Sequence, residues 1–217
     1  MKYILAIFLI AASLSAADNT YELNNLVKTK TGDELLKMVQ DDKLLDNQRW
    51  PVIVAAARQS GEKAIPLFQE LLNKKKYSWY IRTAIAQGLV IVGGSDAVKT
   101  LHTMLNDRSL VVRTVVVDAL GDMMDPTSLT PLTEEMKNKR NFSGEQSLWI
   151  RKHLIDAIAR TGKKKSIPVL ITYLDDPDKE VAVRAKKNLA DYVKMDGKET
   201  WSKRNWIDWW MQSGKKI

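Results

Sequence analysis

The chain of 217 residues is basic, with 34 lysines and arginines, 26 aspartates and glutamates, and a formal net charge of +8 at pH 7. It has no cysteine, which excludes disulfides, thiol catalysis, cysteine-based zinc sites and a lipid anchor on cysteine. A positive net charge favours an acidic partner. Nucleic acid is the first candidate for a basic protein, so the compartment of the protein decides between nucleic acid and other acidic partners.

Residues 1–17 have the order of features that is typical of a secretory signal peptide. Lys2 gives a short positive region, residues 3–12 are apolar but too few for a stable membrane-spanning helix, and residues 15–17 are small. Cleavage after this stretch would leave Asp18 as the first residue; a buried N-terminal helix is the alternative interpretation. Export predicts a periplasmic or secreted protein without a membrane anchor, and it argues against nucleic acid as the partner.

A pattern of an apolar residue, an arginine and a small residue six positions after the arginine recurs along the chain. The pairs are Ile81-Arg82, Val112-Arg113, Ile150-Arg151 and Val183-Arg184, and the small residues are Gly88, Ala119, Ala157 and Ala190. An upstream copy places Trp50 in the arginine position, with Ala56 six residues later. The copies recur about every 31–38 residues. A repeat of this length predicts one supersecondary unit that buries its apolar face by stacking on its neighbours.

Each repeat has the periodicity of two helices. Residues 97–105 and 110–123 place apolar side chains at helical spacing, and residues 167–174 and 180–192 repeat the arrangement. Proline near the start of a helix is tolerated because the missing N–H has no helical partner there, as at Pro66 and Pro168. Asp107 and Asp178 each precede an arginine of the pattern by six residues, where a carboxylate can cap the second helix.

This pattern resembles the HEAT repeat family in its short bacterial form, often named the PBS-lyase type. The residues that carry the resemblance are the Val/Ile-Arg pairs, the small residue after them, LDDPDKEVAVRAKKNLA at 174–190 and SGEKAIPLFQELL at 60–72. The resemblance covers about residues 32–193. It implies an all-α, right-handed α-solenoid of about five helical hairpins within residues 18–200, with the second helices lining the concave face. The family consists mostly of binding proteins; some members bind nucleic acid, and a few are lyases or glycosylases.

Two stretches depart from the pattern. Trp50-Pro51 replaces the arginine and its follower, which predicts a degenerate capping repeat. An excursion at residues 137–145 lengthens one repeat just before Trp149, and it contains Phe142. A longer loop on the rim of a solenoid is often where a ligand binds, but a tolerated surface insertion is the equal alternative.

The C-terminal segment 201–217 is rich in tryptophan and ends in a basic tail. Residues 201–212 can form an amphipathic helix with Trp206, Trp209 and Trp210 on one face. We expect this helix to cap the last repeat, because an open solenoid end exposes apolar surface. An aromatic platform for a glycan or a peptide is the alternative.

The sequence offers little support for catalysis. His102 and His153 are outside any metal-binding spacing, and no phosphate loop, nucleophile elbow or paired-carboxylate motif occurs. We therefore expect no enzyme, no cofactor and no metal. A HEAT-like DNA glycosylase is the remaining enzymatic alternative, because Trp149 and Asp156 could share a helix face; predicted export argues against it.

The candidate binding residues form a polar ladder on the second helices, opposite the predicted core face. Its members are Arg82, Thr83, Gln87, Arg113, Thr114, Asp118, Arg151, Lys152, Asp156, Arg184 and Asn188, joined by Phe142 of the excursion. We expect the arginines to tie adjacent repeats together by pairing with a neighbouring aspartate, although the ladder still borders the groove that a ligand would occupy. The sequence thus predicts a protein-binding scaffold, an adaptor or inhibitor of an envelope protein with an acidic surface. A binder of anionic glycan or wall polymer is the alternative.

Overall fold

The computed structural model describes residues 25, 27–74, 76–193 and 200–212; the predicted signal peptide lies outside them. Helices alternate between two layers of a stack. The first helices of the repeats are α2 (Gly32–Val39), α4 (Ile65–Asn73), α6 (Gly94–Met104), α8 (Leu129–Glu135) and α10 (Ile167–Thr172). The second helices are α3 (Asp46–Ser60), α5 (Trp79–Val92), α7 (Leu110–Met123), α9 (Ile150–Gly162) and α11 (Lys179–Val193), followed by α12 (Lys203–Gln212).

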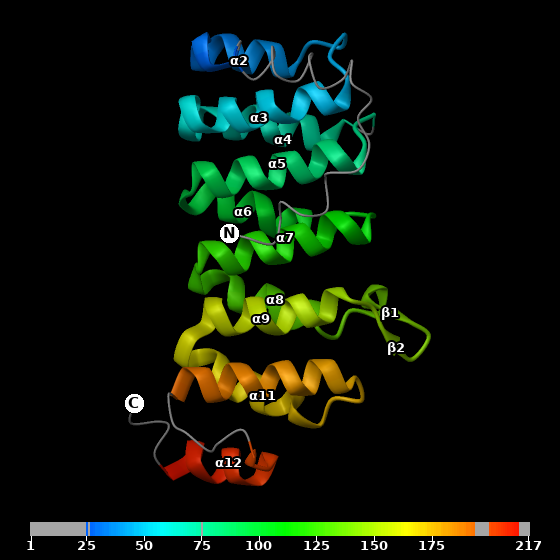
Figure 1. The fold of residues 1–217 in the computed structure, drawn as a ribbon, viewed down its shortest axis with the longest axis vertical. Helices are drawn as coiled ribbons and strands as arrows, with labels where there is room; N and C mark the ends of the chain where they lie inside the picture. The colour runs from blue at the N-terminus through cyan, green and yellow to red at the C-terminus, as the bar shows by residue number, and fades with distance from the viewer. Residues whose placement is uncertain (1–24, 26, 75, 194–199, 213–217) are drawn as a thin grey trace.

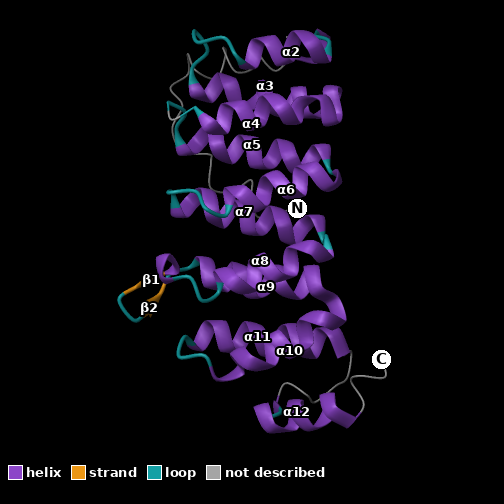
Figure 2. Cartoon of the chain, turned by 180° about the vertical axis from the view of Figure 1, so that it is seen from behind, coloured by secondary structure: helices purple, strands orange, loops and turns teal. Residues whose placement is uncertain are grey.

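The second helices lie side by side in chain order along the long axis (Figure 1), and Figure 2 shows the first helices of the other layer. Short 3-10 turns lead into or out of the first helices: η1 (Gly61–Ala64), η2 (Pro126–Ser128), η4 (Lys163–Ser166) and η5 (Tyr173–Asp175). The all-α solenoid predicted from the repeat pattern is confirmed. No helix within the described residues is long and apolar enough to cross a membrane.

The core lies between the two layers. Each second helix contributes side chains four residues apart that are fully buried, because this spacing keeps them on one helix face. In α5, α7 and α9 these are Ile81, Ile85, Leu89, Val112, Val116, Leu120, Ile150, Leu154 and Ile158. The small residue of the pattern lies where elements approach closely. A Cβ on Gly88 would come within 2.9 Å of the Phe68 ring, and one on Gly121 would come within 3.0 Å of Ala157.

Polar side chains cap the helices as the sequence indicates. Thr31 and Glu34 form a capping box at the start of α2. Asp178 accepts a hydrogen bond from the Glu180 N–H at 3.0 Å in the first turn of α11. Asp107 accepts one from the Ser109 N–H at 2.7 Å, just before α7. These bonds satisfy N–H groups that have no partner within the helix.

The first repeat corrects one prediction. Arg49, not Trp50, occupies the arginine position: it is 3% exposed. Its guanidinium donates to the Val39 carbonyl, and its Nη2 donates to those of Asp41 and Leu44 at 2.8 and 2.9 Å. The repeat is therefore a regular unit in this respect. The Trp-Pro pair obscured the register, because Trp50 is followed at the right distance by a small residue.

The last repeat corrects another. In α11 the buried side chains are Val181, Ala185, Leu189 and Ala190, whereas Val183 is 66% exposed and Arg184 is exposed. The arginine position falls on Ala182, so the predicted pair is displaced by two residues. Val181 and Val183 are equally apolar, but only Val183 is followed by an arginine. The Val183-Arg184 pair therefore suggested the wrong register.

The excursion forms a turn and a hairpin on the rim of the stack. Turn η3 (Lys139–Asn141) leads into β1 (Phe142–Ser143), which pairs antiparallel with β2 (Gln146–Ser147) (Figure 1). The Phe142 ring lies against the buried Arg151 guanidinium, 4.6 Å from its central carbon. Phe142 therefore covers a structural cation from within the protein, which accounts for an aromatic residue in this loop.

Helix α12 packs against α10 at the end of the stack (Figure 1). Trp206 is fully buried, and its ring centroid lies 5.1 Å from that of Trp201 and 5.7 Å from that of Trp209. Lys203 Nζ donates to the Thr172 carbonyl at 3.2 Å and fixes the helix on the last repeat. These contacts are those of a cap.

Candidate interaction surface

Three of the four predicted ladder arginines do not face solvent, whereas Arg184 is exposed. Arg82, Arg113 and Arg151 are 7%, 4% and 4% exposed, respectively. The anchor position lies about 100° around the helix from the core position before it, so the long side chain turns into the gap between repeats. The prediction that these side chains lie opposite the core is therefore wrong.

Two of the arginines join adjacent repeats through an aspartate. Arg82 donates to both carboxylate oxygens of Asp107, at 2.6 and 3.0 Å. Arg151 donates to both oxygens of Asp176, at 3.1 and 2.6 Å. Bidentate pairs of this kind combine charge with fixed geometry. These two arginines thus connect one repeat to the next, which is the role that the sequence predicts for them.

Arg113 has a neutral partner instead. Its Nη2 donates to the Arg140 carbonyl and to Asn141 Oδ1, both at 3.3 Å. Burial and the nearby Arg140 charge lower the pKa of Arg113. Asn141 in turn donates to Glu135 Oε2 at 3.0 Å, so that a carboxylate compensates the guanidinium through the amide.

Charged and amide members of the ladder form contacts across neighbouring second helices. Asp118 Oδ1 lies 2.9 Å from His153 Nδ1, and Asp156 pairs with Arg184. Asn188 donates to Asp156 Oδ1 at 2.9 Å. Lys152 pairs with Glu180. The hydroxyls of the buried Thr83 and Thr114 donate to backbone carbonyls of their own helices, and Gln87 is half-buried. The glycosylase alternative requires Trp149 and Asp156 to share one helix face. In the structure both side chains have partners on neighbouring second helices: Trp149 Nε1 donates to Thr114 Oγ1 at 2.9 Å, and Asp156 pairs with Arg184.

Large exposed apolar residues lie on the second-helix layer. Within the described part of the chain, none of them belongs to the first helices α2, α4, α6, α8 or α10. On the second helices and their ends they are Leu45, Trp79, Ile91, Val111, Met124, Trp149, Val183 and Tyr192, with Ile207 and Met211 on α12. Exposed apolar side chains that gather on one face indicate an interaction site. We define the second-helix face as the exposed side of α3, α5, α7, α9 and α11.

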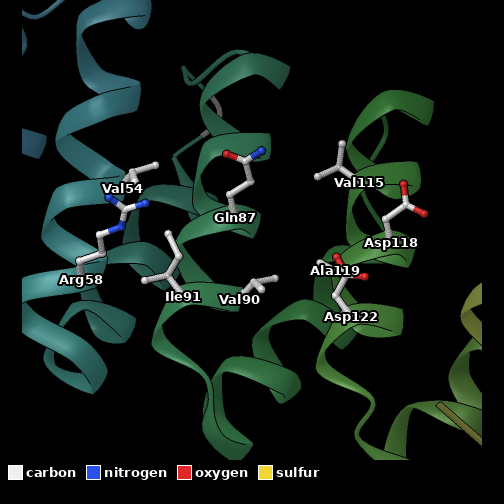
Figure 3. A pocket seen from close by; sticks show the side chains of 9 residues that line it. All are labelled: Val54, Arg58, Gln87, Val90, Ile91, Val115, Asp118, Ala119 and Asp122. Carbon is white, nitrogen blue, oxygen red and sulfur yellow. The ribbon is translucent and has the colours of Figure 1, made fainter. Parts of the chain in front are cut away.

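A shallow recess of about 280 Å³ lies on this face, between α3, α5 and α7 (Figure 3). Its apolar residues include Val54, Val90, Ile91 and Val115, and its charged residues are Arg58, Asp118 and Asp122. Gln87 and Asp118 were predicted from the sequence as site residues; the other residues of the recess were not. Val54 and Arg58 follow Arg49 in α3 at the same spacing as Gln87 and Ile91 follow Arg82 in α5. With the register set at Arg49, the sequence would therefore have placed all four side chains on the equivalent face of their helices.

The described residues contain no cluster of three His, Cys, Asp or Glu side chains that could hold a metal ion. His102 lies away from the recess, on α6, where its Nε2 is 2.8 Å from Ser128 Oγ. Burial lowers the pKa of His102, and the Asp125 charge opposes this effect. The His102 contact joins α6 to the turn before α8.

A family model described as HEAT repeats matches residues 75–143. Residues 75–143 thus resemble HEAT repeats, in agreement with the repeat pattern along the stack. Deoxyhypusine hydroxylase of Drosophila melanogaster is 26% identical over 157 residues, which are 72% of this chain and 45% of that protein. The chain thus spans less than half the length of this curated relative.

The solved structures include a similar solenoid in the complex of CpcE and CpcF of phycocyanin lyase from Nostoc sp. PCC7120. The similarity has a TM-score of 0.58 at 17% sequence identity and covers 77% of this chain and 66% of that chain. At this identity the match supports the solenoid fold of the HEAT-like chain.

Proposed function

We propose that the chain is an exported protein-binding scaffold without chemistry of its own, and that it acts as an adaptor or inhibitor of an envelope protein through the second-helix face. The observation that carries the proposal is the concentration of exposed apolar residues on that face. A HEAT-repeat scaffold is suited to such a role, because stacked repeats offer an extended rigid surface. The net positive charge of the chain favours a partner with an acidic surface.

The proposed site differs from the predicted polar ladder. The three buried arginines hold the repeats together, so a partner would meet the exposed apolar residues and the polar side chains between them. Val111, 37% exposed, and Val183, 66% exposed, lie on this surface in different repeats. Their distribution along the stack suits a partner that contacts several repeats.

Affinity purification from an envelope extract of the native host tests the proposed binding. Val111→Asp and Val183→Asp should each reduce recovery of the bound protein several-fold, because a charge cannot replace an apolar contact without desolvation cost. Thr130→Asp, at an exposed position of α8, is the matched control and should retain the partner. Equal recovery with all variants would contradict binding through this face. Recovery of an anionic polymer alone, reversed by high salt, would support the polymer alternative.

The mass of the native protein tests the proposed export. Cleavage of the predicted signal peptide leaves a chain that begins at Asp18 or within a residue or two of it. Intact-protein mass spectrometry of material from the native host gives this mass directly. A chain that keeps residues 1–17 would contradict the proposed compartment.

A further inference from the structure

The recess on the second-helix face has the size of a side-chain site. Its volume of about 280 Å³ lies below the ~300–1,000 Å³ of typical small-molecule pockets. Val54 comes from α3, Val90 and Ile91 from α5, and Val115 from α7, so three repeats build its apolar part (Figure 3). The recess therefore suits one or two apolar side chains of a partner rather than a whole small molecule.

The charged side chains around the recess differ in whether they have a partner within the protein. Asp122 on α7 pairs with Arg160 of α9 at 2.7 Å, and Asp118 lies 2.9 Å from His153 Nδ1. Arg58 on α3 is exposed and has no ion pair within the described residues. Figure 3 shows its side chain beside Val54, on the opposite side of the recess from the two aspartates. Arg58 is thus the recess cation that has no ion pair, whereas each of the two aspartates already has a hydrogen-bonding partner on α9.

We infer that this recess binds a segment of a partner protein in which an apolar side chain is accompanied by a carboxylate. The inference rests on the proposed function and specifies the partner chemistry at one site. The apolar side chain enters between Val54, Ile91 and Val115, and the carboxylate pairs with Arg58. The apolar contact supplies the affinity, while the ion pair sets the register and selects acidic segments over basic ones. A basic segment would lie beside the unpaired Arg58. It would also have to compete with Arg160 for Asp122 and with His153 for Asp118.

Selection from a random 12-residue peptide library, displayed on phage against the full mature chain, tests the inference without assuming a sequence. We expect enriched peptides to combine an apolar residue with Asp or Glu. The best peptide, made synthetically, should bind Arg58→Gln about 10-fold more weakly, which corresponds to about 1.4 kcal/mol. Ile91→Ser should weaken it as well. Exchanging the acid of the peptide for its amide should have the effect of Arg58→Gln, and the two changes together should not add.

Arg160→Gln is the matched control. Arg160 occupies the same position relative to Arg151 as Arg58 does relative to Arg49, on the same face, but it is already paired with Asp122. Arg160→Gln should change the affinity for the peptide less than about twofold, because the exposed Arg160–Asp122 pair contributes little free energy. Enrichment of Lys- or Arg-containing peptides, equal losses at Arg58 and Arg160, or no enrichment at all would overturn the inference.

The two proposals fail separately. A partner protein that is lost with the Val111 and Val183 variants, together with no preference for acidic peptides, would leave the scaffold role standing and refute the inference. Acidic peptides that bind through Arg58, together with no protein recovered from the envelope extract, would support the recess chemistry and refute the proposed role.

Discussion

Buried arginines connect adjacent repeats of this stack through ion pairs that are almost completely removed from solvent. Arg82 and Asp107 have side chains only 9% and 10% exposed, and Arg151 and Asp176 only 5% and 6%. A charge at such a position requires a partner, because desolvation without compensation is costly. Arginine, which usually lies at the protein surface, is therefore buried here between one repeat and the next.

Removing one partner of such a pair should be more harmful than replacing both. We expect Asp107→Ala to cost about 3–5 kcal/mol in unfolding free energy, since it leaves the Arg82 guanidinium buried and unpaired. The double variant Arg82→Met with Asp107→Leu should recover most of this loss. Urea denaturation measures the unfolding free energy of the single and the double variant. Lys99→Ala, which removes the exposed Lys99–Asp96 pair, is the control and should cost less than about 0.5 kcal/mol. A double variant as unstable as the single one would contradict the uncompensated charge as the cause.

His102 should make stability depend on pH. Burial lowers its pKa in the folded chain below the ordinary value of 6.5, so the unfolded chain takes up a proton at higher pH than the folded chain. Unfolding free energy should then fall as the pH decreases from above 6.5 into the range below it. His102→Gln, which can still bond to Ser128, should reduce this slope. Urea denaturation between pH 7.5 and 5.5 compares the two proteins; parallel slopes would assign the pH dependence to other groups.

At the scale of the helices, close approach between neighbours explains the small residue of each repeat. Ala157 in α9 faces Gly121 in α7, where an added Cβ would lie 3.0 Å away. We expect Ala157→Leu to cost about 1–3 kcal/mol, because the larger side chain forces the helices apart. Lys152→Leu on the same helix should cost less than about 0.5 kcal/mol, since Lys152 lies partly exposed. Chemical denaturation would refute this packing if the two substitutions cost the same.

The sequence predicted helix pairs and the central repeats well, since four-residue apolar spacing and the arginine coincide in α5, α7 and α9. It failed where these two signals separate. In the first repeat Arg49 is preceded by Gln48 rather than by an apolar residue, and in the last repeat the arginine position holds Ala182. Periodicity alone places Val181, Ala185 and Leu189 on one face, and it is the more reliable guide because burial decides the register.

At the scale of the whole molecule, the candidate site could be predicted only in part. Gln87 and Asp118 were found, because they lie on the exposed side of their own helices. The recess itself requires α3, α5 and α7 to be aligned, and an error of one residue at Arg49 misplaces its α3 side. The buried ladder arginines were placed on the exposed face for a related reason: a single helix does not show which long side chain turns back toward its neighbour. For Arg82 and Arg151 the pairing with a neighbouring aspartate was predicted. The stack, rather than any one repeat, creates both the buried ion pairs and the binding surface.

The cap and the recess lie at different places along the stack, and this separation gives the last prediction. Helix α12 covers the last repeat, whereas the recess lies among α3, α5 and α7 (Figure 1). Deleting residues 201–217 removes the buried Trp206 and exposes apolar surface of α10. The deletion should cost at least about 3 kcal/mol and promote concentration-dependent association, because a solenoid needs a sealed end.

Binding of the selected peptide should nevertheless survive in the fraction that stays folded, since repeats contact only their neighbours. Sedimentation velocity reports the association, and peptide titration at 10 °C reports the binding. Met211→Ser, on the exposed side of α12, is the control and should change neither. A folded truncated chain that no longer binds the peptide would place the binding platform at the tryptophan-rich end instead of on the second-helix face.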